Sequence, residues 1–251
     1  MKNSTIFLKF LKGIAVFLFW LSIWYIAAFF VNKEIFLPFP HTVATRFLTL
    51  CQKSEFWITC AASIFRILRG FLYGIALGFI TAVLTYYIPF VKVIIAPFLR
   101  TVRAVPVVSF ILLAFLWLDN DAIPVFIALL MVLPIIWENL SAGFNSLDNS
   151  LNEMAAVYKI PKRKTFLRII LPQLKPHFYS GALTSLGLAW KSGIAAEVIS
   201  YPTVAIGKAM NNAKTTLDTA EVLVWTVTLV AFSLIFEGLF KLIFKKESER
   251  I

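Results

Sequence analysis

The chain has 251 residues, of which 60% are hydrophobic and only 15% are charged. A soluble domain of this length needs a polar surface that this composition cannot supply, so a water-soluble globular fold is excluded. The formal net charge of +11 does not indicate nucleic-acid binding, because the basic residues fall between long apolar runs. There they set the orientation of a membrane protein, or contact anionic lipid headgroups.

The first apolar run predicts a membrane span at residues 10–31. It is longer than a signal-peptide core, and no small-residue cleavage site follows before Asn32, so we expect the span to be retained. A polar stretch at residues 32–60 comes next and is expected outside the cell. Its Leu37-Pro38-Phe39-Pro40 sequence favours an extended chain leading into a short surface helix at 41–50.

The second span is predicted at residues 67–88 and carries a glycine at every fourth position. Gly70, Gly74 and Gly78 therefore share one helical face, where a neighbouring helix can approach closely. We interpret this face as a packing surface.

Four more spans are predicted at residues 105–118, 122–142, 177–199 and 221–243. Lys and Arg gather at the N-terminus, at 89–104, at 143–176 and in the charged tail at 245–250, whereas the Asp119–Asp121 loop has none. The positive-inside rule then places both termini and the basic segments in the cytoplasm. The sequence thus predicts an all-α, polytopic membrane protein with about six transmembrane helices, as one domain over residues 1–251 with its core at 58–245.

The long basic loop at residues 143–176 has the pattern of a helix–turn–helix. Pro161 breaks the first helix and suits the first turn of the second, whose Phe166 and Ile169 supply an apolar face. The small residues Ala155 and Ala156 allow another surface to approach. Such a unit on the cytoplasmic side predicts a docking site for a partner protein.

This loop resembles the EAA motif found in the permeases of ATP-binding-cassette importers. Glu153, Ala155 and the following Leu-Pro pair match in place, whereas Met154 and Lys159 stand where the motif has Ala and Gly. The resemblance assigns ATPase coupling to Glu153, Ala155, Ala156, Tyr158, Lys159, Ile160, Pro161, Leu171 and Pro172.

The resemblance extends over residues 37–245 and is strongest to the nitrate/sulfonate/taurine branch. It is carried by Leu37-Pro38-x-Pro40, Ser63-x-x-Arg66-x-x-x-Gly70, the Pro106 region, Gly181, Ala196-Glu197 and Asp218-Thr219-Ala220-Glu221. It implies a type I importer permease in the inner (cytoplasmic) membrane that pairs with a second permease copy. It also implies two ATPase subunits and an extracellular or periplasmic solute-binding protein as partners. The implied solute is small and anionic, with a neutral or heterocyclic solute such as a thiamine precursor as the alternative.

The chain has no Gly-x-x-x-x-Gly-Lys-Ser/Thr phosphate loop, so ATP hydrolysis is expected of a partner chain. No catalytic residue, metal site or cofactor is predicted, since the ionisable residues within the spans are single and scattered and His41 and His177 are isolated. An intramembrane enzyme would need a cluster of such groups, and a secondary transporter would normally show internal repeats. Only the importer permease needs the basic loop at 143–176.

Lys191 is the main candidate for the translocation path, together with its neighbour Ser192 and with Glu197. An ammonium group near the middle of a span costs roughly 2.5–3.5 kcal/mol. Lys191 either faces an aqueous path for an anion, or pairs with a carboxylate or snorkels. Glu197 lies six residues further on, off the face of Lys191, and belongs either to a gate or to the interface.

The other charged residues near span ends are interpreted as interfacial. Arg66 and Arg69 are expected to contact lipid headgroups at the outer start of the second span. Glu138 is expected at the cytoplasmic interface.

Overall fold

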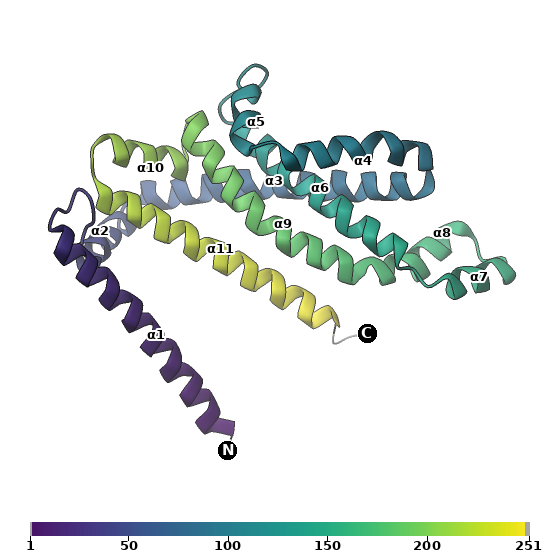
Figure 1. The fold of residues 1–251 in the computed structure, drawn as a ribbon, viewed down its shortest axis with the longest axis horizontal. Coiled ribbons are helices and arrows are strands. Elements are labelled where there is room, and N and C mark those ends of the chain that lie inside the picture. The colour runs from purple at the N-terminus through teal and green to yellow at the C-terminus, as the bar shows by residue number, and fades with distance from the viewer. Residues whose placement is uncertain (1, 249–251) are drawn as a thin grey trace. The chain divides into compact units, whose positions relative to one another are not determined.

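The computed structural model describes the backbone of residues 2–248 and the side chains of residues 11–242, and every regular element in that range is a helix (Figure 1). The predicted all-α fold is therefore confirmed. The charged side chains expected in the C-terminal tail at 245–250 lie outside the described residues.

Four helices in the described range are long and apolar enough to cross a membrane: α1 (Lys2–Val31), α3 (Ser54–Tyr87), α6 (Ile123–Asn145) and α11 (Thr219–Ser248). A fifth is counted if α4 (Pro89–Ala104) and α5 (Val107–Ala114) form one broken span, since they meet at a bend of 102°. The remaining predicted span, at 177–199, lies within the 30-residue helix α9 (Leu171–Ser200).

The structure changes the prediction for residues 89–118. The span expected at 105–118 is the eight-residue helix α5, which at 1.5 Å per residue extends only about 12 Å. Pro106 explains the break, because the residue before a proline avoids helical geometry, and Val105 is extended at φ −76° and ψ 135°. The basic stretch at 89–104 is itself a helix rather than a simple loop.

The chain divides into two compact units. The first comprises residues up to 59 together with 209–230, and contains α1, α2 (Pro40–Cys51), much of α10 (Ile206–Thr215) and the start of α11. The short helix predicted at 41–50 is confirmed by α2. Here Arg46 of α2 donates from Nη2 to Asp218 and to Glu221, both at 2.7 Å, so a carboxylate just before α11 and one in its first turn hold α2 in place.

The second unit comprises residues 60–208 and 231 onwards, and its centre is the long packing contact between α6 and α9. The glycine face of α3 packs on α6. A methyl group added to Gly74 or Gly78 would lie 2.6 or 2.8 Å from the Cβ of Val132 or Ile136. The predicted packing surface is thus confirmed, and its neighbour is α6.

The α5 helix closes one end of this core. Ile111 and Ala114 of α5 are buried with Ile123 and Ile127 of α6 and Ala196 of α9. This packing fixes the last turns of α9, where Glu197 lies.

Candidate functional site

The predicted helix–turn–helix is present between α6 and α9. It consists of α7 (Asn149–Val157), α8 (Lys162–Thr165) and a π-helical turn at Phe166–Ile170 that continues into α9. Asp148 caps α7, because its carboxylate accepts hydrogen bonds from the Ser150 N–H at 2.9 Å and the Ser150 hydroxyl at 2.7 Å. These bonds hold the pKa of the Asp148 carboxyl below its usual value. We call residues 146–170 the α7–α8 loop.

The turn between the two helices is built on Lys159. This residue has a left-handed backbone with φ +49°, which is the conformation that glycine adopts most easily. The Ile160 N–H donates to the Ala155 carbonyl at 2.9 Å and the Lys159 N–H to the Ala156 carbonyl at 3.0 Å, which is the Schellman pattern at a helix end. The turn therefore forms with lysine in the position where the EAA motif has glycine.

The base of the α7–α8 loop is attached to the first turns of α9. The Asp148 N–H donates to Gln173 Oε1 at 3.0 Å, and Ser146 Oγ lies 3.2 Å from His177 Nε2. These contacts attach the first residues of the loop to the helix that follows it, so the loop extends from a base that is held by hydrogen bonds.

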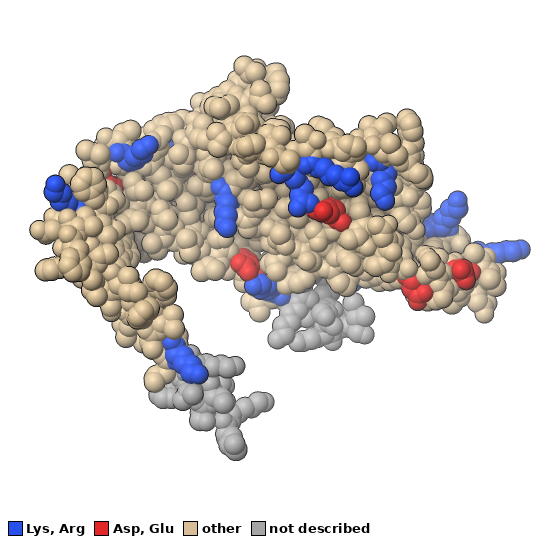
Figure 2. Space-filling view, in the orientation of Figure 1, with Lys and Arg blue, Asp and Glu red and all other residues tan. Residues whose placement is uncertain are grey.

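The tip of the α7–α8 loop exposes apolar side chains. Val157 and Tyr158 are 77% and 75% exposed. Ala155, in contrast, is buried within the chain, so of the two alanines only Ala156 can meet a partner. Glu153, Lys159 and Pro161 are exposed as well. Figure 2 shows both basic and acidic side chains over α7 and α8.

The last residues of the predicted coupling set lie farther along the chain. Ile160 and Leu171 are half-buried, whereas Pro172 is exposed in the first turn of α9. The structure thus brings the predicted coupling residues into one segment but does not expose all of them.

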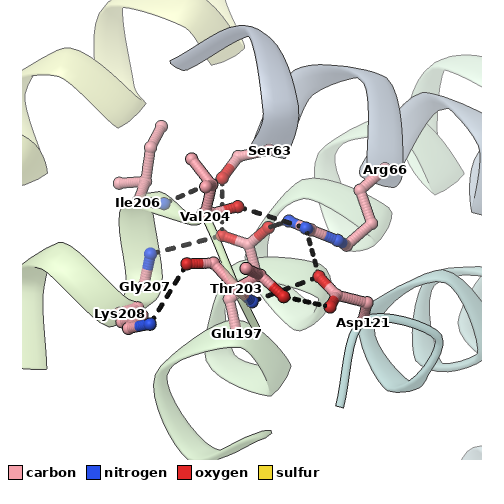
Figure 3. Close-up of polar contacts among 9 residues, drawn as sticks. All are labelled: Ser63, Arg66, Asp121, Glu197, Thr203, Val204, Ile206, Gly207 and Lys208. Carbon is pink, nitrogen blue, oxygen red and sulfur yellow. Dashed lines mark hydrogen bonds and ion pairs between the residues drawn. The ribbon is translucent and has the colours of Figure 1, made fainter. Parts of the chain in front are cut away.

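A second arrangement of polar groups surrounds Glu197, near the end of α9 (Figure 3). The Glu197 side chain is fully buried, and both of its oxygens accept hydrogen bonds. Arg66 Nη1 donates to Oε1 at 2.7 Å, and Ser63 Oγ donates to Oε2 at 2.7 Å. The Gly207 N–H also donates to Oε2, at 3.2 Å.

Arg66 continues this arrangement to the loop between α5 and α6. Its Nη2 donates to Asp121 Oδ1 at 2.8 Å and to the Val204 carbonyl at 3.1 Å. Thr203 donates from Oγ1 to Asp121 Oδ2 at 2.7 Å, and this bond is the main reason why the pKa of Asp121 is lowered. We call Ser63, Arg66, Asp121, Glu197 and Thr203 the Glu197 cluster.

The expectation that Arg66 contacts lipid headgroups is wrong. The Arg66 side chain is only 11% exposed and pairs with two carboxylates. These partners are 55 and 131 residues away in the sequence, so no local pattern could have revealed them. The only local signal was the Ser63-x-x-Arg66 spacing, which places both side chains on one face of a helix.

The three predicted translocation residues do not form one site in this structure. Lys191 is exposed on α9, whereas Ser192 is buried and donates to the Leu188 carbonyl of its own helix at 2.8 Å. Glu197 pairs with Arg66 and not with Lys191. Within residues 11–242 no group of three or more His, Cys, Asp or Glu side chains is arranged to hold a metal ion.

The chain matches the family model described as "Binding-protein-dependent transport system inner membrane component" over residues 74–248. It is 32% identical over 189 residues to the "Putative aliphatic sulfonates transport permease protein SsuC" of Escherichia coli K12, covering 75% of this chain and 72% of that protein. It is 27% identical over 159 residues to the "Bicarbonate transport system permease protein CmpB" of Synechococcus elongatus, covering 62% of this chain and 56% of that protein.

A solved structure shares the fold. It is described as an amino acid ABC transporter with histidines, and its TM-score is 0.65 at 15% identity. The match covers 80% of this chain and 98% of the solved chain.

Proposed function

Because the chain belongs to the family of inner membrane components of binding-protein-dependent transport systems, and is the membrane permease subunit of an ATP-binding-cassette importer, we propose that its ATPase docks on the α7–α8 loop. As a multi-pass protein of the inner membrane, it presents this loop to the cytoplasm. A separate ATPase chain supplies the energy, and two permease copies line the path.

One observation carries the docking proposal: the loop presents exposed Val157 and Tyr158 on a base that is fixed to α9. Exposed apolar side chains of this kind are typical of protein–protein interfaces. The hydrogen-bonded turn at Lys159 joins the tip to α8, which continues through the π-helical turn into α9. Force applied to the tip by a partner would therefore be passed along this segment to α9.

We propose further that the solute is a small anion, delivered by an external solute-binding protein. The relatives named for aliphatic sulfonates and for bicarbonate support this, because both solutes are anionic. The exposed ammonium group of Lys191 on α9 is the candidate contact in the path, and a role for Glu197 in a gate stays a prediction.

Disulfide cross-linking tests the docking proposal. Val157→Cys is made in a Cys51→Ser, Cys60→Ala background and paired with single cysteines in the docking groove of the cognate ATPase. We expect a cross-link that forms only with oxidant and whose yield changes when ATP is added. Phe36→Cys is the matched control, since Phe36 is 70% exposed but lies in the stretch predicted outside. Cross-linking of Phe36→Cys to the ATPase, or no cross-linking of Val157→Cys, refutes docking on the α7–α8 loop.

Glu153→Lys provides a functional test of the same proposal. Glu153 is exposed on α7, so its substitution should leave membrane insertion intact but reduce ATP-driven uptake. Full uptake by this variant would contradict a coupling role for the loop.

A further inference from the structure

The helix α4 is amphipathic, but its charged face points inward and its apolar face points outward, the reverse of a surface helix in a soluble protein. At 100° per residue, Lys92, Arg100 and Arg103 fall within an arc of about 80°. Ala96 and Leu99, which are buried, belong to the same side. The charged face of α4 is therefore turned toward the body of the protein.

The opposite face of α4 is apolar and exposed. Phe90 and Val93 are 73% and 72% exposed, and Ile94 and Phe98 share this side. In water this arrangement would be unfavourable, but in a bilayer the apolar face meets lipid and the charged face meets a polar interior. In length and composition, α4 and α5 together are apolar enough to form one broken span.

The charged face of α4 borders a hollow of about 280 Å³ between α4 and α6. Lys92, Arg100 and Arg103 line it on the α4 side, and Trp137, Glu138 and Ser141 on the α6 side. Figure 2 shows basic side chains gathered beside an acidic one over α4. The volume is close to the lower limit of roughly 300 Å³ for small-molecule pockets, so it suits a small solute.

The hollow has an excess of positive charge. Three cations line it against one carboxylate, and that carboxylate, Glu138, is engaged by Arg103. Among residues 11–242, Lys92 and Arg100 form no ion pair. The hydroxyl of Ser141 is buried with no hydrogen-bond partner in the same range, so it is available to donate to a ligand.

We propose that this hollow is an anion-binding site, in which Lys92, Arg100 and the Ser141 hydroxyl bind the oxyanion group of a small ligand such as a sulfonate. Charged donors on one side and a hydroxyl on the other match the three oxygens of such a group. Trp137 provides an apolar wall for the rest of the ligand. The proposal rests on the proposed function in taking the transported solute to be an anion, and the headgroup of an anionic lipid is the second source of the same chemistry.

Thermal unfolding of the full chain in lipid nanodiscs tests the site without an ATPase. The discs contain phosphatidylcholine only, and methanesulfonate is titrated at constant ionic strength. We expect Tm to rise with methanesulfonate and not with methanesulfonamide, which has a similar shape but no charge. In Lys92→Gln and Arg100→Gln the apparent Kd should increase roughly tenfold or more. Arg100→Lys should retain part of the binding.

The control variant is Lys53→Gln, which removes an exposed lysine between α2 and α3 and should bind as the wild type does. Because the residues changed are exposed, the variants are expected to fold, and the ligand-free Tm verifies this. A second set of discs contains phosphatidylglycerol and no methanesulfonate. If phosphatidylglycerol stabilises the protein, methanesulfonate does not, and Arg100→Gln loses the stabilisation, the site is supported and its ligand is lipid.

Two results would overturn the proposal. One is the absence of stabilisation by either anion, and the other is undiminished stabilisation in both glutamine variants. Either result would leave the docking proposal intact, because cross-linking at residue 157 does not depend on anion binding. Conversely, a failed cross-link would not alter the binding measured in nanodiscs.

Discussion

Replacement of Glu197 by Gln should destabilise the protein strongly. Three donors, from Ser63, Arg66 and Gly207, converge on its two carboxylate oxygens in a fully buried position. A glutamine of nearly the same shape offers one oxygen and one NH₂ group, so a donor faces a donor in either orientation. The positive charge of Arg66 also loses its buried partner.

The expected magnitude follows from the burial of this pair. Removing one partner of a buried ion pair costs about 3–5 kcal/mol. For a chain of this size, each kcal/mol lowers Tm by about 2–4 °C, so Glu197→Gln should lower Tm by about 6–20 °C. Thermal unfolding in detergent, followed by tryptophan fluorescence, measures this change.

Asp121→Asn is the matched comparison for this prediction. The Asp121 side chain is 50% exposed, and it binds the same arginine at 2.8 Å. Its substitution should therefore cost much less than that of Glu197. Equal shifts for the two variants, or a shift under about 2 °C for Glu197→Gln, would show that the Glu197 cluster does not anchor the fold.

Three other predictions concern the turn, the loop carboxylate and the glycine face. Lys159→Gly should raise the free energy of unfolding by about 1 kcal/mol, because it relieves a left-handed lysine, and a lower Tm would contradict this. The hydrogen bond from Thr203 holds the pKa of Asp121 below its usual range, so the stabilising effect of its carboxylate is complete above the pKa of an unfolded aspartate and is lost as pH falls through the lower folded pKa. The difference in Tm between wild type and Asp121→Asn should thus be constant above about pH 5 and should shrink toward zero at lower pH. Gly74→Ala places a methyl 2.6 Å from a side chain of α6 and should cost about 1–3 kcal/mol, whereas Gly238→Ala, with nothing within 4 Å, should be neutral in the same unfolding assay.

Features with a regular spacing could be predicted from the sequence. The glycines at 70, 74 and 78 repeat every fourth residue, and this period alone defines one face of a helix. The helix–turn–helix at 149–165 was also predictable, because Pro161 ends one helix and starts another.

Features that depend on distant residues could not be predicted. The partner of Arg66 lies 131 residues further along the chain, and only the packing of α3 against α9 brings the two together. The left-handed turn at Lys159 was hidden for a different reason. Lysine gives no signal for positive φ, and the hydrogen bonds of the helix end impose that conformation.

The charged face of α4 lies between these two cases. The positions of Lys92, Arg100 and Arg103 on one arc were present in the sequence, but their number suggested a cytoplasmic stretch. Only the exposed Phe90 and Val93 on the other side show which face meets lipid.

The helix α9 joins the α7–α8 loop at one end to the Glu197 cluster at the other. A helix of 30 residues is a rod of about 45 Å. Because Arg66 and Ser63 hold the far end of α9 through Glu197, a rigid tilt of the helix about that end moves the near end most. A tilt of about 5° would carry the loop end through about 4 Å, so a small change in the angle of α9 is a large displacement of the α7–α8 loop.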